Sequence, residues 1–386
     1  MVTGMPAMSS ESMVGAVFSS RYRLLRLIAE GGLAAVFEAQ DLSGSGRCAL
    51  KVLRSEYAAD RRVVAQFYGG AEVAARLAHP NIARCFGHAP PEEPSPYVVN
   101  ELVEGTSVAS YLRPGLAYEA QIAVPIVRAL LSALAEAHRQ GVVHGDIKPG
   151  NVFLTPRADG PPMVKVLDFG IARAMDAAGG MMTRTRSGAF LGSSSYMSPE
   201  QIRNAREIGP PSDLWSVAIL LYQLLAGREP FIAQTEAAKL TLVLSGEPPS
   251  IAQGKPELAG WRVFFGRALA REAEHRFASA AEMDAAIVEA AGAAARGALG
   301  VSVTDMSPQL AQVVARGGAH AQIEVLRTPV RPPASERGPR GDSTLRAGEV
   351  PMLAPQGSNV PMWIAVVVAT ICLAAGFLAG FVVARL

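Results

Sequence analysis

The sequence predicts an α+β fold in two parts, a small strand-rich lobe followed by a larger helical lobe, with a membrane-spanning helix near the C-terminal end. Three observations support this prediction. Strand patterns fill the stretch from Tyr22 to Leu102, and helical periodicity begins at Gln121. The segment Trp363–Ala384 is an unbroken apolar run without a charged residue.

The strand-rich lobe is predicted from apolar segments bounded by turn-forming residues. Tyr22–Gln40 and Arg47–Leu53 have strand character and flank a turn-forming stretch rich in Ser and Gly at residues 41–46. Tyr97–Leu102 is a further short apolar strand. We therefore expect a small β-rich lobe over about residues 22–103.

The helical lobe is predicted from two apolar patterns. From Gln121 onward, apolar residues recur every fourth position, which places them on one face of a helix. The segment Leu214–Leu225 is almost wholly apolar and is predicted to be a buried helix. We expect the helical lobe to cover about residues 104–291. The apolar stripe of the first helix consists of Ile122, Ile126, Leu130 and Leu134.

Two further stretches are predicted to lack regular structure. Residues 292–361 are rich in Gly, Pro, Ala, Arg and Ser and hold few large apolar side chains, so burial cannot offset the entropy of ordering them. We interpret this stretch as a disordered linker. Residues 1–21 are predicted to be a disordered N-terminus, and they lack the basic and apolar regions of a signal peptide.

Residues 362–384 are predicted to be a single transmembrane helix. The run from Trp363 to Ala384 would be about 33 Å long as a helix, enough to cross a bilayer. A buried core helix is the alternative. More arginines precede the run than follow it, which predicts a cytoplasmic folded domain and an outside C-terminus in the cell membrane. The preceding ones are Arg327, Arg331, Arg337, Arg340 and Arg346, and Arg385 follows.

Gly376 and Gly380 lie four residues apart in this run, a spacing that allows two transmembrane helices to approach closely. They could form a homodimer face, although glycine is also simply frequent in such helices. The net charge of +2 gives no indication of nucleic-acid binding. Three widely separated cysteines support neither a disulfide framework nor a zinc site.

The chemistry is indicated by three short motifs in a fixed order. His144-Gly-Asp-Ile-Lys-Pro-Gly-Asn151 is followed by Asp168-Phe-Gly170 and then by Ser198-Pro-Glu200. This set resembles the catalytic core of the protein kinases, and the similarity extends over about residues 22–291. The chain is identified as resembling the bacterial, eukaryotic-like serine/threonine protein kinases of the membrane-anchored type. The resemblance implies the two-lobed protein kinase fold.

The resemblance also implies the roles of the reacting groups. Asp146 corresponds to the base that accepts the proton of the substrate hydroxyl, and Lys148 to the lysine that neutralises the transferring phosphate. Asn151 and Asp168 correspond to the ligands of Mg²⁺ or Mn²⁺. Lys51 corresponds to the strand lysine that binds the phosphates of ATP. Transfer from ATP to Ser or Thr of protein substrates, including autophosphorylation, is the implied activity.

The phosphate-covering loop Ile28-Ala-Glu-Gly-Gly-Leu-Ala-Ala-Val36 is the weakest match to the family. Gly31 occupies the position of the second family glycine, whereas Ala29 replaces the first, which could weaken ATP binding. The side chains implied around adenine could equally be ordinary core residues. The residues that the resemblance implies for nucleotide binding are Ile28, Gly31, Gly32, Val36, Ala49, Lys51, Glu101, Val103 and Phe153.

Other matched residues have structural or regulatory roles in the family. Asp213 corresponds to an aspartate that braces the catalytic loop, and Glu200 corresponds to the partner of Arg276. A pair of unrelated surface charges is the alternative for Glu200 and Arg276. Gly145 replaces the arginine that binds a phosphorylated activation loop in many kinases, so phosphorylation would matter less here. The candidate phosphosites are Thr183, Thr185 and Ser187.

The largest departure from the family falls on the regulatory helix. Its glutamate, which should pair with Lys51, is replaced by Gly70. Glu72 lies about 200° around the helix and is expected to face solvent, where it could pair with Arg76. The missing ion pair predicts a low basal rate that Gly70→Glu would raise.

An active kinase is the leading hypothesis because the base, both metal ligands and both lysines are present. A weakly active or inactive pseudokinase that works as a membrane-tethered signalling scaffold is the alternative. The same residues disfavour a membrane structural protein without a nucleotide site.

Overall fold

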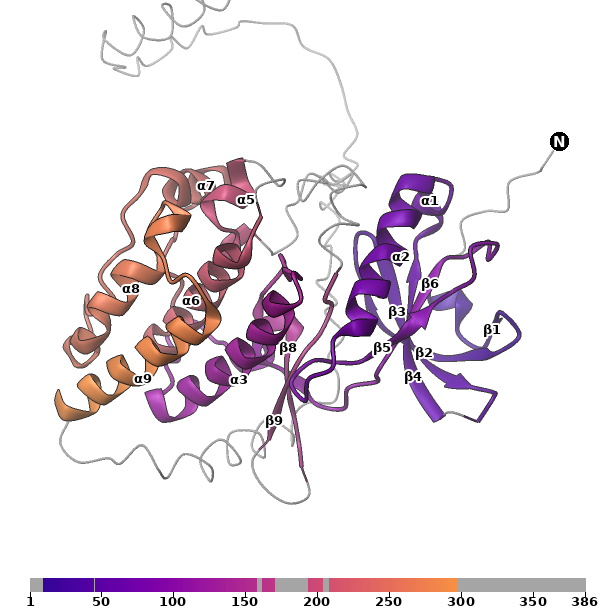
Figure 1. The fold of residues 1–386 in the computed structure, drawn as a ribbon, viewed down its shortest axis with the longest axis horizontal. Coiled ribbons are helices and arrows are strands. Elements are labelled where there is room, and N and C mark those ends of the chain that lie inside the picture. Colours follow the sequence, from indigo (N-terminus) through magenta and orange to yellow (C-terminus); the bar gives the residue numbers. More distant parts are fainter. Residues whose placement is uncertain (1–9, 45, 158–161, 171–193, 204–207, 298–386) are drawn as a thin grey trace, which may run out of the picture. The chain divides into compact units, whose positions relative to one another are not determined.

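The computed structural model describes residues 10–44, 46–157, 162–170, 194–203 and 208–297, with the backbone alone for the last five. These residues form a strand-rich lobe, drawn in indigo and purple in Figure 1, and a helical lobe, drawn in magenta to orange. The strand-rich lobe comes first in the chain, as the sequence predicts.

The strand-rich lobe is built on a six-stranded antiparallel sheet in the order β1-β2-β3-β4-β6-β5. Burial alternates at the start of β2, whereas most positions of the inner strands β3, β4 and β6 are buried and contribute to the hydrophobic core. The strands are β1 (Val17–Phe18), β2 (Tyr22–Glu30), β3 (Ala34–Asp41), β4 (Gly46–Leu53), β5 (Cys85–His88) and β6 (Tyr97–Asn100).

The stretch Tyr22–Gln40, predicted to have strand character, forms two strands, β2 and β3, that are joined in a hairpin. It turns at Gly31 and Gly32, where the Gly31 amide donates a hydrogen bond to the carbonyl of Ala34 at 2.9 Å. Paired glycines favour a tight turn because they lack a Cβ. The break places the predicted phosphate-covering loop at the tip of the β2-β3 hairpin.

Residues 10–21, which we expected to be disordered, are part of this lobe. Ser10–Met13 form the 3₁₀ helix η1, and β1 pairs with β2. The Phe18 ring packs edge-to-face on Tyr97, with 6.3 Å between ring centroids. Met13 and Phe18 both pack against the core, which provides the apolar burial that composition alone does not reveal.

Helix α2 (Arg61–Arg76) follows the short helix α1 (Ser55–Ala58) and packs beside β5. Asp60 caps its N-terminus, accepting hydrogen bonds from the amides of Arg62 and Val63. The paired glycines 69 and 70 lie past the middle of the helix, so they do not weaken its capped first turn.

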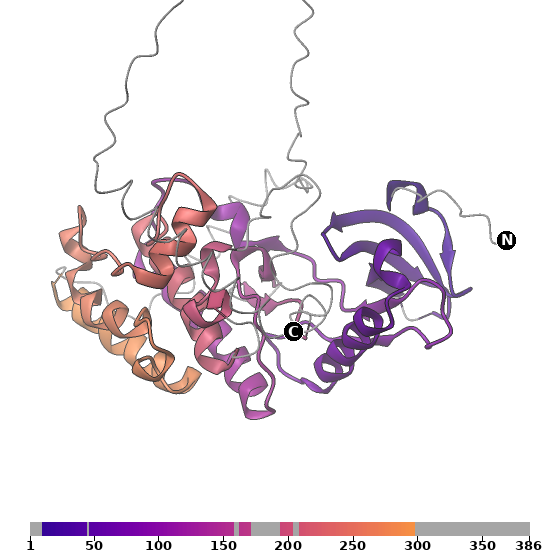
Figure 2. The ribbon, with the colours of Figure 1, turned by 90° about the horizontal axis from the view of Figure 1, so that it is seen from above.

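The helical lobe is organised around α6 (Pro210–Ala226), whose side chains are buried on nearly every face. Proline begins the helix, and Gly227 ends it with a φ of 70°, a backbone conformation that favours glycine. Figure 2 shows the helices of this lobe grouped together, apart from the six-stranded sheet. The other helices are α3 (Ala120–Arg139), α5 (Pro199–Arg203), α7 (Glu236–Ser245), α8 (Arg262–Ala268) and α9 (Ala280–Gly297).

A small antiparallel sheet, β7-β8-β9, lies next to the helices. Its strands are Thr106–Ser107, Val152–Thr155 and Met163–Val166, and the 3₁₀ helix η3 (Pro149–Asn151) leads directly into β8. The first predicted motif therefore ends at Asn151, directly before β8, and the second begins at Asp168, shortly after β9. Further 3₁₀ helices are η2 (Val108–Tyr111), η4 (Ser194–Tyr196), η6 (Pro256–Trp261) and η7 (Ala273–His275).

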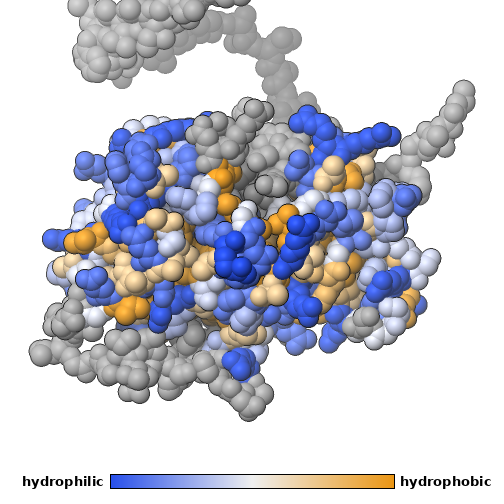
Figure 3. Space-filling view, in the orientation of Figure 1, coloured by the Kyte–Doolittle hydropathy of each residue, from blue (hydrophilic) through white to orange (hydrophobic). Residues whose placement is uncertain are grey.

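Within the described part of the chain, α3 is long and apolar enough to cross a bilayer. Its apolar face lies in the hydrophobic core, and it contacts α6 and α9, so it is a core helix of this lobe. The predicted span at residues 362–384 lies outside the described residues. On the face in Figure 3, hydrophobic residues are scattered among polar ones over both lobes.

Candidate active site

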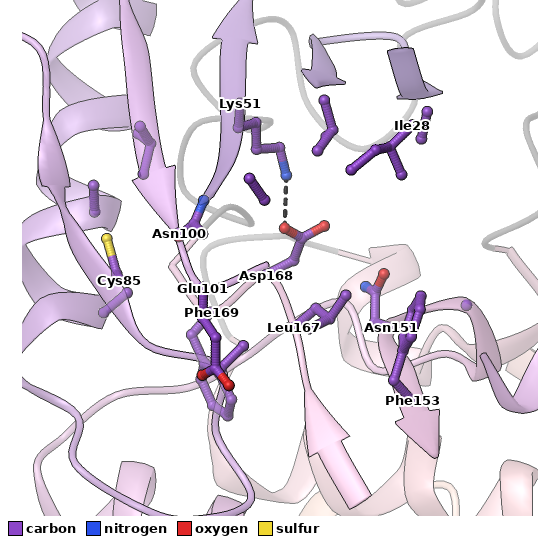
Figure 4. Close-up of a pocket in the computed structure, with 18 of the residues that line it drawn as sticks. Ile28, Lys51, Cys85, Asn100, Glu101, Asn151, Phe153, Leu167, Asp168 and Phe169 are labelled. Carbon is purple, nitrogen blue, oxygen red and sulfur yellow. Dashed lines mark hydrogen bonds and ion pairs between the residues drawn. The ribbon is translucent and has the colours of Figure 1, made fainter. Parts of the chain in front are cut away.

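A cavity of about 230 Å³ lies between the six-stranded sheet and the small sheet. Figure 4 shows Lys51 from β4 reaching into it toward Asp168, with Asn151 and Phe153 on the opposite side. Gly31, Gly32 and Val103 were also predicted to contact nucleotide but do not line this cavity. The predicted residues that do line it are Ile28, Val36, Ala49, Lys51, Glu101, Asn151, Phe153 and Asp168.

Lys51 and Asp168 form an ion pair across the cavity, with 2.8 Å between Nζ and Oδ1. Burial would raise the pKa of Asp168, but the positive charge of Lys51 outweighs burial and holds that pKa below its usual value. Asp168 also has a φ of 66°, which is uncommon for a residue with a side chain. The site therefore keeps an ionised carboxylate in a strained backbone conformation beside a lysine.

The catalytic loop places two predicted residues, Lys148 and Asn151, beside the carboxylate of a third, Asp146. Lys148 Nζ lies 2.7 Å from Asp146 Oδ2. The Asn151 amide donates to the backbone carbonyl of Asp146 at 2.9 Å and to its Oδ2 at 3.2 Å. Lys148 and Asn151 thus both bind Oδ2 of Asp146 and fix the direction of its side chain, as a positioned proton acceptor requires.

His144 links this loop to the Asp-Phe-Gly segment. Its Nε2 donates to the carbonyl of Leu167 at 2.8 Å, and its Nδ1 accepts from the amide of Asp146 at 3.2 Å. Its ring also packs edge-on against Phe169, with 4.6 Å between centroids. The imidazole is fully buried and both of its nitrogens bind backbone atoms, so its role here is structural.

Asp213, in the first turn of α6, holds the backbone of the same loop. Its carboxylate accepts hydrogen bonds from the backbone amides of His144 and Gly145 at 2.9 and 2.8 Å. His138 on α3 lies 2.8 Å from its Oδ2. Asp213 is almost fully buried, so these partners satisfy a carboxylate that would otherwise be costly to bury.

Glu200 and Arg276 meet as a bidentate pair, with N–O distances of 2.8 and 2.9 Å. The Arg276 side chain is fully buried and also lies over the ring of Trp215. Burial would raise the pKa of Glu200, but hydrogen bonds from Arg276 and Ser212 hold it below its usual value. Two unrelated surface charges, the alternative for this pair, do not describe this geometry.

Helix α2 carries Gly70 and is therefore the predicted regulatory helix, and here the structure corrects one expectation. A Cβ added at Gly70 would lie 2.3 Å from the carbonyl oxygen of Gly170, too close for any side chain. Gly70→Glu should therefore disturb the Asp-Phe-Gly segment rather than restore an ion pair. Glu72 is mostly exposed and lies 3.5 Å from His88, away from Lys51, so it faces solvent as expected but does not pair with Arg76.

Several lining residues were not identified from the sequence. Asn100 on β6 and Cys85 on β5 face the cavity beside Phe169. The apolar face of α2 contributes Phe67, Ala71 and Ala74. The three- and four-residue spacing on α2 is a recognisable helical signal, whereas nothing in the sequence marks Asn100.

The Glu101 carboxylate does not point into the cavity. It forms an ion pair with Lys165 of β9 at 2.9 Å, which links the strand-rich lobe to the small sheet. This pairing was not predicted. The candidate phosphosites Thr183, Thr185 and Ser187 lie outside the described residues.

A β-rich lobe, a helical lobe and a cavity between them that joins Lys51, Asn151 and Asp168 define a protein kinase. The chain belongs to this family, because the model for the protein kinase domain matches residues 22–258. The predicted protein kinase family and the two-lobed fold are confirmed, whereas the membrane anchor stays a prediction.

Three similar proteins illustrate the relationship. Serine/threonine-protein kinase pkn3 of Myxococcus xanthus is 38% identical over 248 residues, covering 64% of this chain and 45% of the relative. Serine/threonine-protein kinase PrkC of Bacillus subtilis is 34% identical over 276 residues, covering 71% and 41%. The crystal structure of the Mycobacterium tuberculosis PknI kinase domain matches with a TM-score of 0.56 and 27% identity, covering 72% and 98%. The chain thus spans less than half the length of these two curated relatives.

Proposed function

We propose that this chain is a serine/threonine protein kinase that transfers the γ-phosphate of ATP to hydroxyl groups of proteins, itself included. The observation that carries the proposal is the meeting of Lys51, Asn151 and Asp168 at one cavity, next to the positioned carboxylate of Asp146. The names of the similar bacterial proteins support Ser and Thr as the acceptors.

The donor atoms fit a hard divalent cation. Asp168 presents a carboxylate whose lowered pKa keeps it ionised, and Asn151 presents an amide oxygen. They would hold Mg²⁺ or Mn²⁺, which neutralises phosphate charge when bound. Lys51 would bind phosphate oxygens, and Ile28, Val36, Ala49 and Phe153 would enclose the base.

The reaction needs little more than position and charge. The substrate hydroxyl loses its proton to an oxygen of Asp146 while its oxygen bonds to the γ-phosphorus. The bond from that phosphorus to the bridging oxygen breaks, so ADP leaves with the electron pair. Lys148, held 2.7 Å from Asp146, would stabilise the negative charge on the moving phosphoryl group.

The test is labelling of the full chain, purified in mild detergent, with ATP carrying radioactive γ-phosphate. We expect phosphoserine or phosphothreonine in the wild type, and labelling at least about a hundredfold slower in Asp146→Asn, since a positioned base contributes that much. The signalling scaffold would instead bind ATP with either metal and remain unlabelled. Absence of both binding and labelling would exclude a nucleotide site.

We also propose that residues 362–384 anchor the protein in the cell membrane, with the kinase domain in the cytoplasm. The uncharged apolar run and the arginines before it support this arrangement. Full-length protein that is soluble without detergent, or a kinase domain cleaved by protease outside spheroplasts, would contradict it. Pairing through Gly376 and Gly380 stays a prediction, tested by the loss of a membrane two-hybrid signal in Gly380→Ile.

A further inference from the structure

Helix α2 and the Asp-Phe-Gly segment touch through two glycines. A Cβ built at Gly70 would lie 2.3 Å from the carbonyl oxygen of Gly170, and a Cβ built at Gly170 would lie 2.3 Å from the carbonyl oxygen of Gly70. Real Cβ atoms essentially never come closer than 3.0 Å to such atoms. The two backbones are therefore in direct contact, and neither position has room for a side chain.

The neighbouring residue Gly69 shows that this restriction is local. A Cβ at Gly69 would meet no atom within 4 Å. Alanine is favoured over glycine at interior positions of a helix, so helix stability alone would disfavour glycine at both positions. At Gly70, however, the contact with Gly170 requires it.

The contact lies next to the groups that would bind phosphate and metal. Gly170 follows Phe169, which is buried against His144, and Asp168, which forms the ion pair with Lys51. Gly170 itself has a φ of 84°, so its position depends on a conformation that favours glycine. Any shift of Gly170 away from α2 would move Asp168, and with it the partner of Lys51.

We propose that Gly70 is a positioning residue whose backbone contact with Gly170 takes the place of a glutamate–lysine ion pair on the regulatory helix. The contact holds Asp168 where its carboxylate orients Lys51. This inference rests on the proposed function and names the means by which this chain positions its phosphate-binding lysine. Asp168 thus orients Lys51, and α2 contributes through the backbone contact of Gly70 rather than through a side chain.

The test compares Gly70→Ala with Gly69→Ala in the full chain, because both make the same change to the same helix. Calorimetry measures the Kd for Mg-ATP, and a labelled assay measures kcat/KM. We expect Gly69→Ala to stay within twofold of wild type and to melt at a higher temperature. Gly70→Ala should weaken the Kd about tenfold and lower kcat/KM about a hundredfold, the cost of misplacing a binding group by about 1 Å.

Repeating the comparison in a Lys51→Met chain separates a loss of lysine positioning from a general disturbance of the fold. ATP without a metal ion isolates the role of Lys51, because Asp168 would bind nucleotide through the metal. Gly70→Ala should weaken the Kd for metal-free ATP in the wild-type background but change it by less than twofold in Lys51→Met, where the lysine that it misplaces is already gone. An equal loss in both backgrounds would overturn the proposal, as would a Gly70→Ala protein that matches Gly69→Ala. A Gly70→Ala chain that fails to fold would also contradict it, because the contact would then support the lobe itself.

Failure of the proposed function would look different. A wild-type chain that binds Mg-ATP without transferring phosphate would contradict kinase activity, and the Kd comparison would still decide this inference. Wild-type and Gly69→Ala chains that both fail to bind Mg-ATP would contradict both.

Discussion

The helical lobe and the regulatory helix position their parts of the site by opposite means. In the helical lobe, a buried charge holds the catalytic loop that carries Asp146, because the Asp213 carboxylate accepts hydrogen bonds from two backbone amides. At the regulatory helix, Gly70 and Gly170 bring the backbone of α2 into contact with the Asp-Phe-Gly segment that carries Asp168. A buried carboxylate tolerates only a narrow set of partners, whereas a glycine contact tolerates no side chain at all. The two regions should therefore respond differently to substitution.

Loss of the Asp213 charge should have the largest effect on stability and activity together. In Asp213→Asn, the amide keeps one acceptor oxygen and turns an NH₂ group toward a backbone amide of His144 or Gly145, which loses its partner. One unsatisfied buried donor costs about 1–3 kcal/mol, and a displaced catalytic loop about a hundredfold in kcat/KM. Thermal unfolding and steady-state kinetics measure the two effects.

A matched control is available on the same lobe. Asp284→Asn removes a carboxylate that pairs with Arg128 at 2.7 Å, where both side chains are partly exposed. Exposed pairs contribute at most about 1 kcal/mol, so stability and kcat/KM should both stay near wild type. Equal losses in the two variants would mean that Asp213 has no special role in bracing the loop.

Glu200→Gln should destabilise the helical lobe with little effect on chemistry. It leaves the fully buried Arg276 without a counter-charge, which costs about 3 kcal/mol in free energy of unfolding. Glu200 has a lowered pKa when folded, so its stabilisation is complete above its unfolded pKa of about 4.3 and is lost as the pH falls through the folded value.

The advantage of wild type over Glu200→Gln should therefore be constant between about pH 6 and 8 and shrink below about pH 4. Urea unfolding followed by circular dichroism at several pH values measures it. A difference that grows toward acid pH would show that the pair does not hold the carboxyl ionised.

The smallest effect is expected on the exposed side of α2. Glu72 faces His88 with more than half of its side chain exposed, and it does not reach Lys51. Glu72→Ala should change the unfolding free energy by less than about 0.5 kcal/mol and the rate by less than twofold. A large loss of phosphotransfer would mean that Glu72 pairs with Lys51 when nucleotide is bound.

The comparison also explains what the sequence could and could not predict. The catalytic aspartates, Asn151, Lys51 and the Glu200–Arg276 pair follow from residue types in fixed order, and the long apolar helices follow from periodicity. The strand pattern alone did not divide Tyr22–Gln40, because apolar residues lie on both sides of the turn at Gly31 and Gly32. The N-terminal residues were misjudged because Met13 and Phe18 pack against the core of the lobe, and the Phe18 ring does so against Tyr97 on a strand far along the chain.

The role of Gly70 was misjudged for a different reason. The sequence shows a missing side chain, and a missing side chain indicates a lost interaction. The structure shows a second backbone in that space. A glycine contact of this kind depends on how two segments about a hundred residues apart meet, and neither composition nor spacing records it.

Gly70→Glu tests this account most directly, with Gly69→Glu as its control on the same helix. The initial rate of γ-phosphate transfer by the full chain should fall about a hundredfold in Gly70→Glu, because its side chain displaces Gly170 and Asp168. It should stay near wild type in Gly69→Glu, where an added Cβ meets no atom within 4 Å. A rate that rises in Gly70→Glu would contradict the account and show that the helix needs only its missing glutamate.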